Sequence, residues 1–223
     1  MPTLGLFAKR PVPGAVKTRL AAAIGDEAAA RFYEASLRTL LARVRGLDLR
    51  RVIAYAHNSE ADLAWFQQFE GYELWPQPLG DLGVKLTAWF ESACTTDDRV
   101  LVIGSDSPTL PLEYINDAIT ALDHNDCVIG PAEDGGYYLL GLRRPVPQLF
   151  ERIPWSSPLV IAVTCARAVQ QELQVAVLPY WNDVDDIDDL AVLRDQLTGL
   201  GSEPHWEPLR LEVERIIAES AER

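Results

Sequence analysis

Hydrophobic and polar positions follow two different patterns along this chain. Short, nearly continuous apolar runs are typical of strands that are buried on both faces, and longer stretches with apolar residues every three or four positions are typical of helices. The runs of the first kind predict strands at 3–8, 51–57, 72–77, 99–106, 126–132, 136–142 and 173–180. The stretches of the second kind predict helices at 18–44, 59–69, 81–94 and 112–122, from Pro158 onward, and at 186–198 and 207–221.

Strands that alternate with helices predict an α/β fold with a mostly parallel sheet covered on both faces. The strand at 136–142 follows the strand at 126–132 too closely for a crossover connection, which needs about a dozen residues. We therefore expect one antiparallel strand. Because no repeat, low-complexity tract or linker interrupts the pattern, we expect a single domain over residues 1–223.

The net charge narrows the classes of partner. The chain has 223 residues and a formal net charge of −13. A nucleic-acid binder needs a basic face, and docking on anionic lipid needs one too, so we expect neither nucleic acid nor membrane among the partners. The three cysteines at 94, 127 and 165 are too widely spaced for a disulfide framework or a metal knuckle, and no apolar run is long enough for a membrane span or a signal peptide. These features predict a cytoplasmic protein; the oligomeric state is left open.

Four loops are candidates for the ligand site, because ligands of such sheets bind at the carboxyl ends of the strands. These loops are 8–19, 104–111, 131–136 and 179–186. The first combines prolines and a glycine with four cations: Lys9, Arg10, Lys17 and Arg19. Cations that lead into a helix start suit a phosphate group, and the alternative is a solvated basic loop.

The chain has only one other lysine, Lys85, near the start of the helix predicted at 81–94. It is either a further phosphate or nucleotide contact or a surface residue of that helix. Asp134 lies beside a Gly-Gly turn signal and either reaches the ligand or only decorates the turn.

Three aspartates are candidate metal ligands. Asp106 comes at the end of the most hydrophobic predicted strand, where a carboxylate could hold a hard divalent cation. The alternative is an aspartate that caps the following turn. Asp183 and Asp185 precede the helix at 186–198 and could complete the metal site, although the aspartates from Asp185 to Asp189 could also cap that helix.

The order of these motifs resembles a known family. The segments that carry the resemblance span roughly residues 3–200 and read LFAKRPVPGAVKTRL, DLGVKL, IGSDSPTLP, EDGGYYLLGL, PWSSP and NDVDDIDDL. Together they look like the DUF2064 group of GT-A-type glycosyltransferases, in the nucleotide-diphospho-sugar transferase superfamily. They are similar, more distantly, to the molybdenum-cofactor and phospholactate guanylyltransferases.

The resemblance implies a GT-A fold, which is a Rossmann-like three-layer α/β/α sandwich that binds a nucleotide. It implies that Lys9, Lys17 and Arg19 face phosphates and that Lys85 stands near the position of a family arginine. Asp106 would correspond to a metal-binding aspartate of the D-x-D type, written here Ser105-Asp106-Ser107. The second metal ligand would be Asp183 or Asp185, and Asp134 would lie near the acceptor or the sugar.

Three functions remain open at this stage. The favoured one is a transferase that uses Mg²⁺ or Mn²⁺ and a nucleotide-sugar donor to glycosylate a small acceptor, with Asp106 and Asp134 as catalytic residues. The first alternative is a nucleotidyltransferase that joins a nucleoside triphosphate to a phosphorylated small molecule. Both reactions leave negative charge on a diphosphate and so need the same cations. The second alternative is a nucleotide-binding module without catalysis.

Overall fold

The computed structural model describes residues 1–221. Within these residues the chain forms two compact units. The first contains Met1–Ala8, Asp48–Gly104 and Pro111–Trp181, and the second contains Lys9–Leu47, Ser105–Leu110 and the chain from Asn182 onward. The expectation of a single domain over residues 1–223 stays a prediction.

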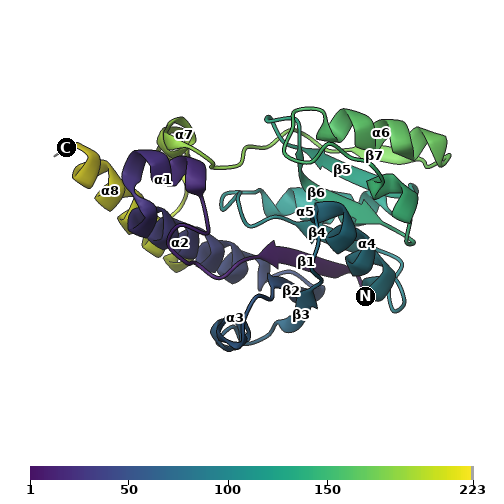
Figure 1. The fold of residues 1–223 in the computed structure, drawn as a ribbon, viewed down its shortest axis with the longest axis horizontal. Coiled ribbons are helices and arrows are strands. Elements are labelled where there is room, and N and C mark those ends of the chain that lie inside the picture. The colour runs from purple at the N-terminus through teal and green to yellow at the C-terminus, as the bar shows by residue number, and fades with distance from the viewer. Residues whose placement is uncertain (222–223) are drawn as a thin grey trace. The chain divides into compact units, whose positions relative to one another are not determined.

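The first unit contains a seven-stranded sheet in the order β3-β2-β1-β4-β6-β5-β7 across the described residues (Figure 1). Strand β6 is antiparallel to its neighbours β4 and β5, and the other pairs are parallel. This confirms the mostly parallel sheet and the single antiparallel strand. The strands are β1 Thr3–Ala8, β2 Arg50–Ala56, β3 Glu73–Gln77, β4 Val100–Ile103, β5 Cys127–Pro131, β6 Tyr137–Leu142 and β7 Val175–Val177.

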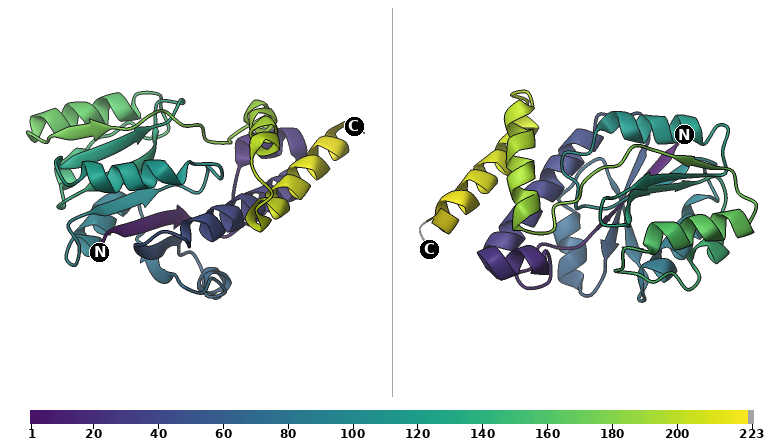
Figure 2. Two further views of the ribbon diagram at one scale, coloured as in Figure 1. Left: turned by 180° about the vertical axis from the view of Figure 1, so that it is seen from behind. Right: turned by 90° about the horizontal axis from the view of Figure 1, so that it is seen from above.

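Helices of the first unit cover both faces of this sheet, as the three-layer expectation requires (Figure 2). On one face, residues of α4, η1 and α6 share a buried cluster with alternate residues of the central strands, such as Val102 and Ile129. On the other face, Leu122 at the end of α5 lies beside Leu101 and Val128. The helices are α3 Glu60–Phe66, α4 Leu82–Ala93, α5 Leu112–Ala121, η1 Pro147–Phe150 and α6 Val160–Gln170.

The second unit is helical and has its own core. The stretch predicted as one or two helices at 18–44 forms two, because Gly25 adopts a φ of 91° between them. Leu20, Phe32, Val184 and Leu209 belong to the shared buried cluster of this unit. The helices are α1 Thr18–Ile24, α2 Asp26–Val44, α7 Ile187–Gly199, η2 Pro204–Trp206 and α8 Glu207–Ala221. Among the described residues, no helix is long and apolar enough to cross a membrane.

One predicted boundary differs in a way that affects the site. The strand predicted at 99–106 ends at Ile103, so Asp106 lies three residues beyond the strand and not at its end. The reason is that the last residues paired with β4 are Leu6 on β1 and Leu139 on β6, both opposite Ile103. The strand predicted at 173–180 is also shorter, covering only Val175–Val177.

Gly5 lies in the middle of β1, close to the ring of Trp89. A Cβ atom at this position would lie 2.5 Å from the ring of Trp89, a buried residue of α4. Because a packed indole cannot move aside freely, we expect Gly5→Ala to lower the free energy of unfolding by about 1–3 kcal/mol. Urea denaturation measures this change.

Gly199 provides the matched control, since it is the last residue of α7 and a Cβ atom added to it would have no neighbouring atom within 4 Å. Gly199→Ala should be neutral or should stabilise by up to about 1 kcal/mol. Equal effects of the two substitutions would contradict the packing of Trp89 against β1.

Candidate functional site

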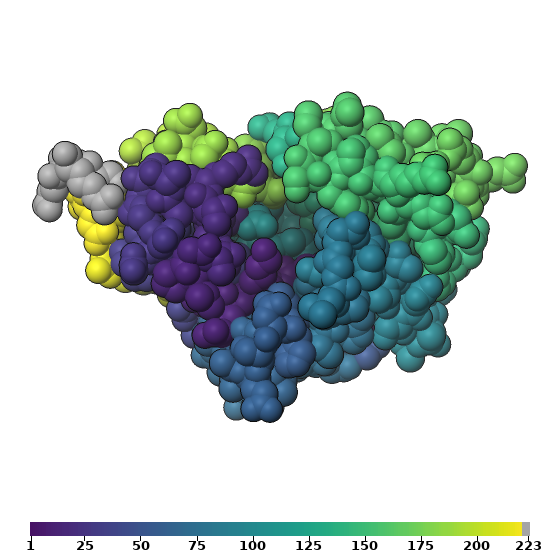
Figure 3. Space-filling model, in the orientation of Figure 1, coloured from purple at the N-terminus to yellow at the C-terminus, as the bar shows by residue number. Residues whose placement is uncertain are grey.

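Three segments of the second unit bring Lys17, Asp106, Asp183 and Asp185 together. They are the loop 9–17, the loop 105–110 and the segment 182–186. The backbone N–H of Val184 donates to the Asp106 carbonyl at 3.0 Å, and the Ser107 hydroxyl donates to the Asp183 carboxylate at 2.5 Å. Most of the loop 9–16 and the first residues of α1, Thr18 and Arg19, are at the surface, in the dark purple region of Figure 3.

Lys17 is the centre of this cluster. Its ammonium group forms ion pairs with both Asp106 and Asp185, although its side chain is only 3% exposed. Burial alone would lower the pKa of Lys17, but the two carboxylates outweigh it, and the pKa is raised above its usual value. Lys17 therefore carries its charge at neutral pH and supplies the cation that Asp106 and Asp185 share.

The backbone of Lys17 is also unusual. It precedes α1 with φ 47° and ψ 46°, the left-handed conformation that a side-chain-bearing residue seldom adopts. Such a conformation costs about 1–3 kcal/mol and persists only where the surroundings fix it. Here the burial of Leu20 in the core and the two ion pairs of Lys17 fix the loop.

Asp185 has a second cationic partner. Arg19 donates to Asp185 at 2.5 Å, and Arg19 itself is 68% exposed. The N-terminus of α7 is capped by other residues: Asp186 accepts from the N–H groups of Asp188 and Asp189. The capping alternative thus describes Asp186, whereas the side chain of Asp185 faces the cations of the cluster.

The environment of Asp183 disfavours its ionised form. Burial, together with the neighbouring Asp106 and Asp185, raises its pKa to about 6, against the opposing effects of the Ser107 hydrogen bond and of Lys17. Val184 between the two acids is buried in the core, which anchors the segment and holds Asp183 and Asp185 in place.

Tyr33 is a site residue that the sequence did not reveal. It lies on α2, is buried, and its hydroxyl accepts a hydrogen bond from the Lys9 N–H at 3.0 Å. The same hydroxyl is 2.8 Å from the Ser105 hydroxyl, to which it can give its own proton. Burial and then the charge of Asp106 raise the pKa of Tyr33, so it stays protonated. A tyrosine on an apolar helix face needs a polar partner, and that was the available signal.

The remaining predicted residues are placed differently. Lys9 is exposed and Arg10 is half-buried in the loop after β1. Lys85, on α4, and Asp134 both belong to the first unit. Asp134 accepts from the Gly136 N–H at 2.9 Å in the turn between β5 and β6, which is the contact expected of a turn residue. The ligand-binding roles of these four residues stay predictions.

The donor set of the cluster fits a hard divalent cation. Asp106 and Asp185 offer carboxylate oxygens, the ligands that Mg²⁺ and Mn²⁺ prefer, and the Lys17 ammonium stands in for a cation between them. The part of the chain that the structure describes contains no group of three or more acidic, histidine or cysteine side chains arranged to hold a metal ion. Metal binding by Asp106, Asp183 and Asp185 therefore stays a prediction. The structure shows two carboxylates, those of Asp106 and Asp185, around one ammonium group.

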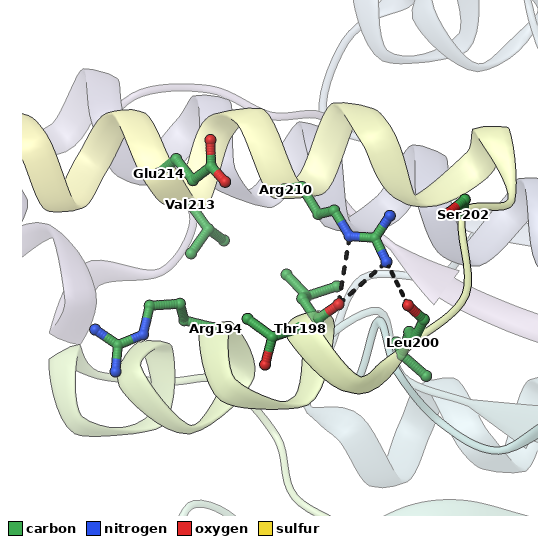
Figure 4. Close-up of a pocket in the computed structure, with 8 residues that line it drawn as sticks. Arg194, Thr198, Leu200, Ser202, Arg210, Val213 and Glu214 are labelled. Carbon is green, nitrogen blue, oxygen red and sulfur yellow. Dashed lines mark hydrogen bonds between the residues drawn. The ribbon is translucent and has the colours of Figure 1, made fainter.

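A pocket of about 380 Å³ lies elsewhere in the second unit, between α7 and α8 (Figure 4). Its lining includes Arg194 and Arg210 but none of the predicted site residues. Arg210 donates to the carbonyls of Leu197 and Leu200 at 3.1 and 2.9 Å, so its charge is used to cap the end of α7.

Comparison with known proteins decides the family. The family described as "Uncharacterized protein conserved in bacteria (DUF2064)" matches residues 39–157, more than half of the chain. The chain belongs to the DUF2064 family. A solved structure described as a "putative nucleotide-diphospho-sugar transferase" from Desulfovibrio desulfuricans G20 is 32% identical to this DUF2064 protein, with a TM-score of 0.90 over 100% of this chain and 98% of the other.

More distant solved structures share the fold of this DUF2064 protein. The inositol-1-phosphate CTP transferase of T. maritima is 13% identical, with a TM-score of 0.56 over 96% of both chains. A cytidylyltransferase from Leptospira borgpetersenii is 12% identical, with a TM-score of 0.58 over 100% of this chain and 96% of the other. A comparison with curated proteins found no match to the chain. The fold is thus that of nucleotide-diphospho-sugar transferases and nucleotidyltransferases.

Removal of the Tyr33 hydroxyl tests its role in joining two loops. Tyr33→Phe leaves the Lys9 N–H and the Ser105 hydroxyl without their partner, which should lower the free energy of unfolding by about 1–3 kcal/mol. Amide hydrogen exchange at Lys9 should become faster. Tyr180, which is 63% exposed, is the matched control, and Tyr180→Phe should change stability by less than about 0.5 kcal/mol. An unchanged Lys9 exchange rate would contradict the proposed bridge.

The raised pKa of Asp183 predicts that the stability of the protein depends on pH. The unfolded chain loses the Asp183 proton near pH 3.8 and the folded chain near pH 6, so the Asp183 contribution to stability falls as the pH rises between these values. Asp183→Asn removes this loss and still offers an oxygen to Ser107. Relative to the parent, the variant should gain roughly 1–3 kcal/mol between pH 4 and pH 7 in urea denaturation.

Glu91 on α4 is exposed, and Glu91→Gln is the control for a general charge effect. The prediction fails if Asp183→Asn gains no more stability between pH 4 and pH 7 than Glu91→Gln does.

Proposed function

We propose that this protein is a divalent-cation-dependent transferase whose donor is a nucleotide sugar and whose leaving group is a nucleoside diphosphate. The observation that carries the proposal is the buried Lys17 ammonium held by Asp106 and Asp185. A site that already pairs a cation with two carboxylates contains both of the elements that a metal–diphosphate complex needs. The fold, and the similarity to the structure described as a nucleotide-diphospho-sugar transferase, support a transferase that acts on a nucleotide.

The cations of the first loop are assigned to the diphosphate. Lys17 and Arg19 meet at Asp185, so both charges are directed toward the same place in the second unit. Cations held beside a leaving diphosphate stabilise the negative charge that develops on it. Lys9, Arg10 and Lys85 are proposed as further contacts to the phosphates or the nucleotide.

The carboxylates are assigned to the metal. Asp106 and Asp185, with Asp183 as a further candidate, would hold Mg²⁺ or Mn²⁺. The bound ion supplies positive charge to the phosphate oxygens of the leaving group. Asp134 is proposed to lie beside the acceptor or the sugar, where a carboxylate orients the attacking hydroxyl and takes up its proton.

Nucleotidyl transfer is the second candidate. The segment that contains Lys17 and Arg19 resembles the corresponding loop of guanylyltransferases, which favours a nucleoside triphosphate donor. In that reaction a phosphorylated acceptor attacks the α-phosphorus and pyrophosphate leaves. The two reactions are distinguished by their products: nucleoside diphosphate for glycosyl transfer, and pyrophosphate for nucleotidyl transfer.

Asp106 provides the test of the proposed function. The assay incubates the protein with panels of nucleotide sugars and nucleoside triphosphates, with Mg²⁺ or Mn²⁺, and follows release of nucleoside diphosphate and pyrophosphate by ³¹P NMR. Asp106→Asn keeps the size and the hydrogen-bonding capacity of the side chain but removes its charge. We expect turnover to fall about 100-fold or more and the metal-induced rise in melting temperature to disappear.

Asp186→Asn is the control, because Asn is as good a helix cap as Asp. It should retain turnover and the metal response. Binding of nucleotides without any release of product would favour a non-catalytic module, and an unchanged metal response in Asp106→Asn would overturn the assignment of the metal to this residue.

A further inference from the structure

The buried position of Lys17 limits what else can occupy the cluster. Its ammonium takes up oxygens of both Asp106 and Asp185, and only 3% of its side chain is exposed. The other oxygen of Asp185 is taken by Arg19, so a divalent cation that bridges the two carboxylates competes with the ammonium for Asp185. Two like charges a few ångströms apart repel strongly when one of them is shielded from solvent, as Lys17 is, so Lys17 and the divalent cation exclude each other.

Lys17 cannot leave the carboxylates without another partner. A buried ammonium group that loses its counter-charges carries a large desolvation cost. The phosphate oxygens of a diphosphate are a suitable replacement, because they are anionic and accept several hydrogen bonds. The four-carbon stem of lysine lets the ammonium swing while the backbone of Lys17 stays in place.

We propose that Lys17 is an internal counterion that couples the binding of two ligands, a diphosphate group and a divalent cation. When the diphosphate takes the ammonium, Asp106 and Asp185 become free for the cation. Because such coupling is reciprocal, a bound cation also releases Lys17 for the diphosphate. This inference rests on the proposed function and adds to it an order of events at the same site.

The arrangement of the cations gives the test a matched control. Arg19 carries the same charge as Lys17 and contacts Asp185 but is 68% exposed, whereas Lys17 contacts both carboxylates from a buried position. Lys17→Met and Arg19→Met each remove one positive charge and keep an unbranched side chain. A general charge effect would change the Mn²⁺ affinity equally in both variants. The loss of a competing counterion would change the Mn²⁺ affinity mainly in Lys17→Met.

The experiment measures two affinities separately, so that the two ligands cannot combine in solution. Binding of Mn²⁺ alone is followed by the EPR signal of the free ion, and binding of inorganic pyrophosphate is followed by titration calorimetry with a chelator present. In Lys17→Met we expect Mn²⁺ to bind at least tenfold more tightly than in the parent, which lies near the lower end of the usual range of coupling. Pyrophosphate should bind at least tenfold more weakly. Arg19→Met should weaken pyrophosphate but should change Mn²⁺ affinity less.

The opposite signs of the two changes separate exchange from simple damage to the site, which would weaken both ligands. If Lys17→Met is too unstable to titrate, Lys17→Gln takes its place, and Mn²⁺ should raise the melting temperature of this variant more than that of the parent. The inference is overturned if Lys17→Met binds Mn²⁺ no more tightly than Arg19→Met or the parent does. In that case the proposed function still stands, provided that the parent binds pyrophosphate. If neither the parent nor the variants bind Mn²⁺ or pyrophosphate, both the inference and the proposed function are overturned.

Discussion

The organisation of the second unit depends on one ion-pair network, in which the buried Lys17 ammonium is shared by the partly exposed carboxylates of Asp106 and Asp185. The network joins three segments that are far apart in the sequence, and Tyr33 adds a second junction between the loops of Lys9 and Ser105. A buried charge is tolerated only with its counter-charges in place, so removal of either carboxylate leaves the Lys17 ammonium poorly compensated. These contacts constrain the loops that carry the candidate site more tightly than surface loops usually are.

The cluster is organised at the expense of local stability. Lys17 adopts a left-handed backbone conformation, and Asp183 is placed where its ionised form is disfavoured. Neither feature is needed to build a helical unit whose core contains Phe32, Leu193 and Leu209. Strained backbone and disfavoured charge are typical of sites whose geometry serves a ligand. This agrees with a site that exchanges one cation for another.

Much of the fold could be predicted from the sequence because its determinants are local. The apolar runs predicted the strands, and the short connection between β5 and β6 required the antiparallel pairing. The end of β4 was placed too late, since a strand ends where its neighbours stop pairing, and the sequence of the strand alone does not contain that information.

The site was only partly predictable, for a related physical reason. The residue types of Lys17, Asp106 and Asp185 pointed to anion and cation chemistry, but Lys17 and Asp185 are 168 positions apart, and nothing local to either residue shows that they pair. Tyr33 was overlooked because an amphipathic helix shows which face is buried and not which polar group lies opposite a hydroxyl. The roles of Asp134 and Lys85 depend on ligands and stay predictions.

The most direct test is anomalous diffraction from crystals grown with Mn²⁺ and pyrophosphate. The account predicts an Mn²⁺ peak at the carboxylates of Asp106 and Asp185, with the Lys17 ammonium moved onto the phosphate oxygens. An Mn²⁺ peak away from these carboxylates, with Lys17 still bridging Asp106 and Asp185 while pyrophosphate is bound, would contradict it.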